Sequence, residues 1–252
     1  MSNILVCKNY KITDHSKWYD DRTNEENLVD NYIKMQDLCV KSAQENIIDL
    51  DTVKIFTGEA DNIRDVFKKN FFEIYELWQE GHNILYADLD VVFTQPVNYF
   101  SDYNHFAMFN FTDPPRTTDE HYNLVFDHYF NCGIRYYPEE MDQSIWDKGI
   151  QMMENWNPER WDSEQIIYNA MLWSQEDVSP QDVWKPQLAY QMLLDPTTTS
   201  GNSINKNFNK IDHTQAGAIH VHGSRGSKNR LDLMQALLDG TLEPVQDEVL
   251  YL

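Results

Sequence analysis

The first 95 residues alternate between short apolar runs and longer amphipathic segments, and this pattern constrains the fold more than any other feature of the sequence. Apolar runs of strand length occupy residues 4–7, 53–57 and 84–87. The segments between them, residues 31–48 and 62–80, carry apolar side chains every three or four positions, as amphipathic helices do. Strand, helix, strand, helix, strand predicts an α/β fold with a mostly parallel central sheet flanked by helices.

Two aspartates follow the third predicted strand. Asp88 and Asp90 stand between the apolar run at residues 84–87 and a second apolar run at residues 91–93. Residues i and i+2 of an extended chain point to the same side, so the two carboxylates are predicted to lie close together. Such a pair among buried residues is repulsive unless a cation or a shared proton lies between the carboxylates. We therefore predict a divalent cation with oxygen ligands here. The alternative is that one aspartate caps a turn while the other faces solvent.

The chain is strongly acidic. Its 252 residues include 20 Lys and Arg and 41 Asp and Glu, which gives a net charge of −21. Such a charge opposes binding to nucleic acid and to anionic membranes, so no nucleic-acid partner is expected. An anionic substrate would need locally positive residues or a bound metal.

The cysteines and the N-terminus bear on the compartment. Cys7, Cys39 and Cys132 are far apart in the sequence and odd in number, so they predict neither a disulfide framework nor a cysteine metal site. The first apolar run is too short for a signal peptide, and no later run approaches the length of a membrane span. We expect a soluble, cytoplasmic protein with no transmembrane segment.

Two further segments have the composition of ligand-binding regions. The first predicted strand leads into a polar loop at residues 8–26, which contains Tyr10. Later, residues 130–133 combine the side-chain amide of Asn131 with Gly133. An amide can bind a sugar hydroxyl, and a glycine lets a ligand or another backbone segment approach closely. A strand with a bulge at Gly133 explains the same residues.

Two helices are predicted in the middle of the chain. Residues 141–156 have a helical apolar period, with Asp142 at the N-cap position. The next helix opens near Asp162, Glu164 and Gln165. Asp162 and Gln165 have the spacing of a capping box. Two acids and an amide at one helix N-terminus can also line a substrate cavity, and the two interpretations are compatible.

A basic segment interrupts the acidic chain at residues 206–230. Its five basic residues are Lys206, Lys210, Arg225, Lys228 and Arg230.

A strand predicted to begin at Ala218 carries His220 and His222 on one face and runs into a glycine- and serine-rich loop. A neutral imidazole can ligate a cation, while Arg225, Lys228 and backbone N–H groups can neutralise phosphates. The segment therefore predicts a phosphate-bearing ligand.

Four segments, in order along the chain, resemble motifs of GT-A-fold glycosyltransferases, most closely those of the nucleotide-diphospho-sugar transferase group. The matches are Asp88-Leu89-Asp90 with its Asp-X-Asp, Phe130-Asn131-Cys132-Gly133 with its Phe-Asn-X-Gly, Glu164-Gln165 and Asn169 with its Asp-Gln-X-X-X-Asn, and His220, Gly223, Gly226 and Lys228 with its C-terminal His and Lys segment. The resemblance covers residues 4–228. It implies a GT-A fold and a glycosyltransferase that moves a sugar from a nucleotide-sugar donor to a glycan or other hydroxyl acceptor.

The resemblance also implies roles for single residues. Asp88, Asp90 and His220 would hold Mn²⁺ or Mg²⁺, and Asp88 would contact the metal, the donor's ribose, or both. Lys228, with Gly223 in the same segment, would hold the diphosphate and stabilise the leaving group.

Other matching residues would surround the base and the sugar. The region around Tyr10 would face the nucleobase. The cavity for the donor sugar and the acceptor would be lined by Asn131, Gly133, Glu164 and Gln165. An inverting enzyme would need a carboxylate base, for which Asp162 and Glu164 are the candidates. The resemblance implies a retaining enzyme, which needs no base there.

The sequence departs from the group's pattern at three positions. Glu164 stands where the group usually has Asp, and Cys132 occupies the small-residue position. His222 lies near a place often taken by Asn, which leaves it as an alternative ligand to His220.

No internal repeat or Gly/Ser-rich linker divides the chain, so residues 1–252 are predicted to form a single domain. Residues 1–95 would be the nucleotide-binding half and residues 96–230 the half that binds the donor sugar and the acceptor. Residues 231–252 are expected to form a terminal helix and tail without chemistry.

Two functions of other classes also fit part of the sequence. The Asp88-Leu89-Asp90 segment is similar to that of aspartyl-phosphate phosphatases, but those need Gly-Thr after the second aspartate, where this chain has Val91-Val92. A non-catalytic sugar- or Ca²⁺-binding protein is favoured by the acidity, but it does not explain the basic segment around Lys228.

Overall fold

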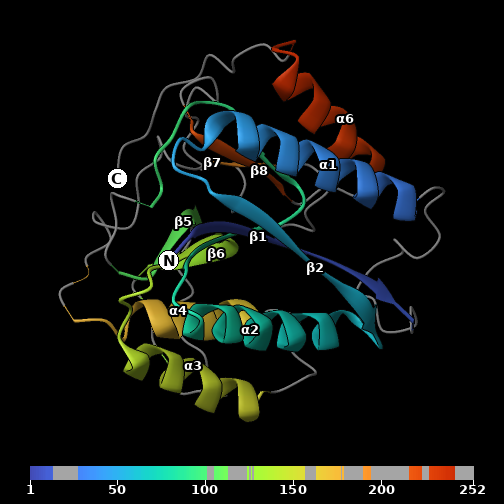
Figure 1. The fold of residues 1–252 in the computed structure, drawn as a ribbon. Coiled ribbons are helices and arrows are strands. Elements are labelled where there is room, and N and C mark those ends of the chain that lie inside the picture. The colour runs from blue at the N-terminus through green and yellow to red at the C-terminus, as the bar shows by residue number, and fades with distance from the viewer. Residues whose placement is uncertain are drawn as a thin grey trace.

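The protein, seen in a computed structural model, is built on a five-stranded sheet with the order β2-β1-β3-β6-β5 and a three-stranded sheet with the order β4-β8-β7 (Figure 1). The structure describes residues 1–13, 28–100, 105–112, 124, 126, 128–156, 163–176, 178, 190–193, 216–222 and 227–241. The strands are β1 Asn3–Ile12, β2 Thr52–Ala60, β3 Asn83–Ala87, β4 Val91–Phe93, β5 Ala107–Thr112, β6 Tyr129–Tyr137, β7 Tyr190–Leu193 and β8 Ala218–His222. The helices are α1 Leu28–Asn46, α2 Ile63–Gln79, α3 Gln143–Glu154, α4 Ser163–Leu172 and α6 Ser227–Leu238.

The predicted α/β architecture with flanking helices is confirmed. β1 pairs in parallel with both β2 and β3, as the alternation of strands and helices in the first 95 residues predicts. β6 then joins β3 in the antiparallel direction, and β5 is antiparallel to β6. The parallel pairing of the larger sheet is therefore confined to its three N-terminal strands, β1, β2 and β3.

β1 is longer than its apolar run, which corrects the start of the predicted loop at residues 8–26. Residues 8–12 belong to the strand, and residues 14–26 lie outside the described residues. Pairing with β3 stops at Val6, but pairing with β2 continues from Lys8 opposite Phe56 to Ile12 opposite Ala60. The polar side chains of this extension alternate between the two faces of the sheet. Asn9 reaches α1, where it donates to Gln36 at 2.7 Å, and Lys8 lies on the α2 side with its Nζ 4.5 Å from the centre of the Phe67 ring.

Helices cover both faces of the larger sheet. α1 and α6 lie together on one side, and α2, α3 and α4 lie on the other (Figure 1). On the second side the aromatic stripe of α2 packs into the core, as predicted, and Phe71 meets Trp146 of α3 edge to face with the ring centres 5.6 Å apart. Asp142 caps α3 as predicted, accepting from the backbone N–H of Ser144 at 2.8 Å.

Among the helices in the described part of the chain, none is long and apolar enough to cross a membrane.

Candidate metal centre

The two sheets are joined by a turn that carries both aspartates. β3 ends at Ala87 and β4 begins at Val91, and the N–H of Val91 donates back to the carbonyl of Asp88 at 3.1 Å. The turn is tied to both sheets, because the N–H of Asp88 donates to Gly133 of β6 and the carbonyl of Asp90 accepts from Val221 of β8, each at 2.8 Å. The aspartates therefore approach one another across a turn and not along an extended strand.

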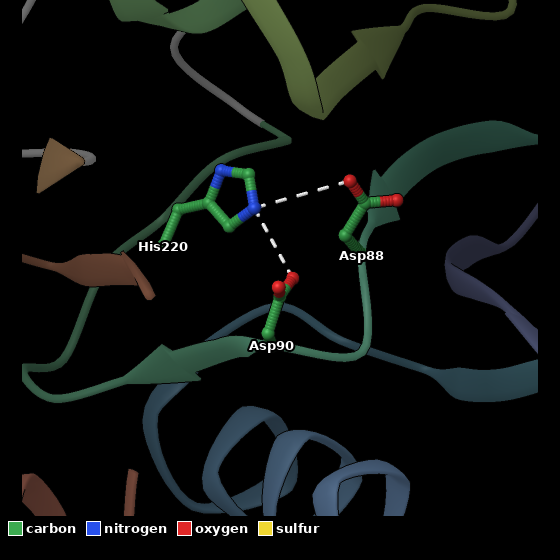
Figure 2. Close-up of side chains that lie close together, drawn as sticks. All are labelled: Asp88, Asp90 and His220. Carbon is green, nitrogen blue, oxygen red and sulfur yellow. Dashed lines mark hydrogen bonds and ion pairs between the residues drawn. The ribbon is translucent and has the colours of Figure 1, made fainter. Parts of the chain in front are cut away.

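His220 of β8 completes a group of three candidate metal ligands with Asp88 and Asp90 (Figure 2). Its Nε2 lies 3.1 Å from Oδ1 of Asp90 and 3.9 Å from Oδ2 of Asp88. One ligand atom from each residue lies within 4.8 Å of the other two. The side chain of Asp88 is 31% exposed, whereas those of Asp90 and His220 are 9% and 1% exposed, so a ligand has access from the Asp88 side.

This donor set fits a divalent cation. Two carboxylate oxygens and an imidazole nitrogen form a mixed oxygen and nitrogen set of the kind that Mn²⁺ accepts. Burial lowers the pKa of His220, but the Asp90 carboxylate and its hydrogen bond, together with Asp88, raise the pKa above its ordinary value. Concentrated negative charge thus attracts a proton to the position that a cation would take, and cation and proton would compete there.

Gly133 makes room for the imidazole. A Cβ atom at this position would lie 2.3 Å from Cε1 and 2.6 Å from Nδ1 of His220, and 2.9 Å from Oδ1 of Asn131. The predicted close approach at Gly133 is thus made by a histidine side chain. The bulge interpretation also holds. Met108 of β5 pairs with Arg135 whereas Asn110 pairs with Asn131, so the pairing of the two strands is irregular at Gly133.

The amides of Asn131 and Gln165 are held by each other and by the backbone. Asn131 accepts from the N–H of Gly133 at 2.8 Å and donates to Oε1 of Gln165 at 3.0 Å. The same Gln165 oxygen accepts from the N–H of Cys132 at 3.4 Å. The first turn of α4 is therefore fixed against β6 close to His220.

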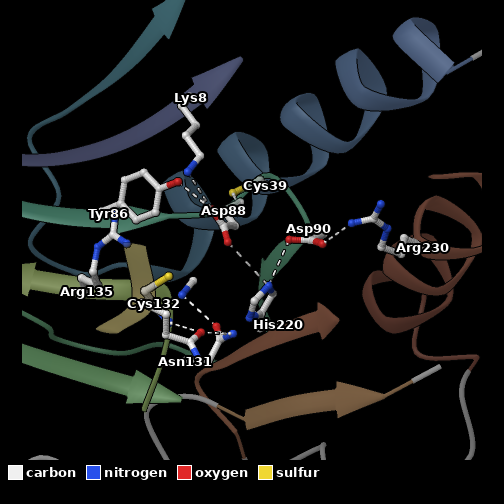
Figure 3. Close-up of polar contacts among 12 residues, drawn as sticks. Lys8, Cys39, Tyr86, Asp88, Asp90, Asn131, Cys132, Arg135, His220 and Arg230 are labelled. Carbon is white, nitrogen blue, oxygen red and sulfur yellow. Dashed lines mark hydrogen bonds and ion pairs between the residues drawn. The ribbon is translucent and has the colours of Figure 1, made fainter. Parts of the chain in front are cut away.

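A group of charged residues, buried except for the partly exposed Lys8, adjoins the metal centre (Figure 3). Lys8 places its Nζ 3.6 Å from Oε1 of Glu164 and 3.9 Å from Oδ1 of Asp88. The fully buried Arg135 lies 3.8 Å from the same Glu164 oxygen, with its guanidinium 4.0 Å from the ring centre of Tyr86. Burial raises the pKa of Glu164, although Lys8 and Arg135 act to lower it.

Arg230 connects the metal centre to the C-terminal helix. Its Nη1 donates to Oδ2 of Asp90 at 2.7 Å, and its Nη2 donates to the hydroxyl of Tyr32 in α1 at 3.1 Å. α6 begins at Ser227, before residue 231 where a terminal helix without chemistry was expected, and this earlier start brings Arg230 to the site.

The structure brings together most of the predicted site residues that it describes. Asp88, Asp90 and His220 converge, and the chain around them contributes Asn131, Gly133, Glu164 and Gln165. Asp162 and Gly223 lie outside the described residues, as do Arg225 and the side chain of His222.

The sequence analysis did not predict three charged residues as part of the site. Lys8 was assigned to a loop, Arg135 falls in an apolar strand, and Arg230 was counted only as one of the basic residues near the C-terminus. An arginine between Ile134 and Tyr136 in a buried strand is the one signal that could have found a buried ionic partner.

Tyr10 lies on the same face of β1 as Lys8, and its hydroxyl donates to Glu73 of α2. Burial and the neighbouring Glu76 raise the pKa of Glu73 to about 7. A carboxyl whose pKa rises on folding stabilises the folded state fully below its unfolded pKa, and this contribution is lost as the pH rises through the folded pKa.

The Glu73→Gln variant keeps an acceptor for Tyr10 and removes the ionisation. The free energy of unfolding of the wild-type protein is therefore expected to fall relative to that of the variant as the pH rises through about 7. Urea unfolding of both proteins at pH 5 and pH 8 measures this difference. An equal change in both proteins between the two pH values would contradict the assignment.

The sequence has no match among protein-family models or curated proteins. Three solved structures are similar to it. The apo structure of the bifunctional glycosyltransferase WbbM is 10% identical, with a TM-score of 0.54 over 92% of this chain and 50% of that chain. A glycosyltransferase involved in the glycosylation of the major capsid of PBCV-1 is 12% identical, with a TM-score of 0.47 over 92% of this chain and 98% of that chain. The galactosyltransferase LgtC, in complex with donor and acceptor sugar analogs, is 13% identical, with a TM-score of 0.47 over 96% of this chain and 98% of that chain.

At 10% identity, the likeness to WbbM is one of fold alone. The α/β fold of GT-A glycosyltransferases, which the sequence motifs predict, is confirmed, and this chain spans half the length of WbbM.

Proposed function

We propose that this chain, which has a GT-A fold, is a metal-dependent glycosyltransferase that moves a sugar from a nucleoside-diphosphate donor to a hydroxyl acceptor. The observation that carries the proposal is the convergence of Asp88, Asp90 and His220 at the turn that joins the two sheets. The carboxyl ends of parallel strands are where α/β sheets bind their ligands, and β3 ends directly before Asp88.

A divalent cation held by these three residues would supply positive charge to the diphosphate as its bond to the sugar breaks. The charges of this chain support an anionic ligand. Asp88, Asp90 and Glu164 are opposed by Lys8, Arg135 and Arg230, so the protein groups nearly balance and a bound cation would make the site positive. The site could then hold a diphosphate in a chain that is acidic overall.

Lys228 is the proposed partner of the diphosphate. It lies in the first turn of α6, where exposed N–H groups also favour anions. Its side chain is 71% exposed and forms an ion pair with Asp232 four residues along the helix. Exposed pairs of this kind contribute little to stability, so the ammonium group can exchange Asp232 for a phosphate at little cost.

Asn131, Gln165 and Glu164 are proposed to line the pocket for the sugar and the acceptor. Glu164 is buried, and one of its oxygens is already close to both Lys8 and Arg135. That placement disfavours Glu164 as the base at an acceptor hydroxyl, and it supports the retaining course that the sequence resemblance implies.

The direct test is nucleotide release from a panel of UDP-, GDP-, CDP- and ADP-sugars, each with Mn²⁺ and with EDTA. The proposal expects release of one nucleotide, dependent on Mn²⁺ and faster with a suitable hydroxyl acceptor. Tight binding of a donor or sugar with no release under any condition would identify a binding protein instead.

A further inference from the structure

Each of the two aspartates at the metal centre has one carboxylate oxygen bound by a protein donor (Figure 3). Oδ1 of Asp88 accepts from the hydroxyl of Tyr86 at 2.5 Å, and Oδ2 of Asp90 accepts from Arg230 at 2.7 Å. The other oxygen of each aspartate is the one directed at His220. The two carboxylates thus present themselves in the same way, with one oxygen toward the protein and one toward the centre.

Both donors are fixed in place. Tyr86 is fully buried in β3, two residues before Asp88. Arg230 is also buried, and its second nitrogen is held by Tyr32. Lys8 adds a further positive charge 3.9 Å from the Asp88 oxygen that Tyr86 binds.

We propose that Tyr86 and Arg230 set the metal preference of this centre, by restricting Asp88 and Asp90 to one coordinating oxygen each and so favouring Mn²⁺ over Ca²⁺. This inference rests on the metal centre of the proposed function. Ca²⁺ takes six to eight oxygen ligands and commonly binds both oxygens of a carboxylate. Chelation by Asp90 would place the cation against the oxygen that already binds the Arg230 guanidinium, and chelation by Asp88 would displace the Tyr86 hydroxyl.

The ratio of the two dissociation constants isolates this effect. Removing Arg230 also makes the centre more negative, which strengthens the binding of every divalent cation. Mn²⁺ and Ca²⁺ carry the same charge, so this general effect largely cancels in the ratio of their affinities. A change in coordination does not cancel, because Ca²⁺, which takes six to eight oxygen ligands, gains more than Mn²⁺ from a second oxygen of the same carboxylate.

Two variants each remove the donor that binds one of these oxygens. Arg230→Met removes a charged donor and is expected to reduce the preference for Mn²⁺ over Ca²⁺ by about tenfold. Tyr86→Phe removes a neutral donor and is expected to reduce it by about threefold. Because Tyr86→Phe deletes a single hydroxyl, it remains informative if Arg230→Met does not fold.

Tyr136→Phe is the matched control. This tyrosine is also buried, in the neighbouring strand β6, and its hydroxyl bonds to Asn83 and to the carbonyl of Phe100 at 3.3 Å each. The Tyr136→Phe variant also loses one buried hydroxyl group, but away from the metal centre. Its preference for Mn²⁺ over Ca²⁺ should equal that of the wild-type protein.

Isothermal titration of the metal-free full chain with Mn²⁺ and with Ca²⁺, at one pH and ionic strength, measures the ratio for all four proteins. A ratio that falls in both folded site variants and not in Tyr136→Phe is the predicted result. Wild-type ratios in both site variants would overturn this inference and leave the proposed function standing. A wild-type protein that binds neither cation would remove the metal centre and both proposals with it.

Discussion

The Asp90→Asn variant is expected to lose Mn²⁺ affinity by at least about 100-fold and to release no measurable nucleotide from a donor sugar. Asp90 supplies one of the three candidate ligand atoms and also holds Arg230 and His220. Asparagine has the same shape, and its carbonyl oxygen can still accept from Arg230. The variant therefore removes the charge with less disturbance than alanine would cause. Mn²⁺ titration and the nucleotide-release assay measure the two losses.

Asp239→Asn is the matched control for this experiment. Asp239 is exposed just beyond α6, where it accepts from Gln235, and its substitution should leave Mn²⁺ binding unchanged. Urea unfolding of both variants shows whether each is folded. Wild-type Mn²⁺ affinity in folded Asp90→Asn would exclude Asp90 from the metal centre.

The second large effect is expected from Gly133→Ala. The new methyl group would lie 2.3 Å from the nearest atom of the His220 ring, too close for any real contact. Either the imidazole leaves its place beside Asp90 or β6 shifts away from β8. Overpacking of this kind destabilises a protein by roughly 1–3 kcal/mol. Displacing a ligand from its geometry should weaken Mn²⁺ binding by at least about tenfold.

Gly149→Ala separates loss of stability from loss of the site. A Cβ at Gly149 in α3 would lie 2.5 Å from the sulfur of Met171 and 2.9 Å from Cζ of Phe71, in the core away from the aspartates. This variant should lose stability and retain Mn²⁺ affinity, whereas Gly133→Ala should lose both. Equal Mn²⁺ affinity in the two variants would contradict the close contact between the His220 ring and Gly133.

Local sequence patterns predict those helices and strands in which buried apolar side chains recur at regular intervals. The two N-terminal helices and the strands around them follow from apolar periodicity, and the strand predicted to begin at Ala218 is β8. The extension of β1 past Cys7 was missed because its side chains are polar. Its conformation is imposed by β2, which supplies backbone hydrogen bonds on one side as far as Ile12.

The candidate ligands could be predicted from the sequence, but their charged neighbours could not. Asp88 and Asp90 are two residues apart, so their proximity is a local property of the chain. Arg230 reaches Asp90 from 140 residues away, and that contact depends on how α6 packs against α1. Helix packing of this kind leaves no short-range pattern.

The cysteines illustrate the same limit. The three thiols are free, as predicted, yet the Sγ atoms of Cys7 and Cys39 lie 3.9 Å apart beside the Asp88 turn. Their separation in the sequence gave no sign of this contact between β1 and α1. The hydrogen bond with Cys7 and burial raise the pKa of the Cys39 thiol, which keeps it protonated.

The central claim is that a divalent cation bridges these residues to a nucleoside diphosphate, and thermal unfolding of the wild-type protein with UDP, GDP, CDP or ADP, each with and without Mn²⁺, tests it most directly. A ligand at about 100 times its dissociation constant adds roughly 2.7 kcal/mol, which should raise the unfolding midpoint by about 5–10 °C. The account predicts a shift with one nucleotide that requires Mn²⁺. An unchanged midpoint with all four nucleotides, or a shift of equal size without the metal, would contradict it.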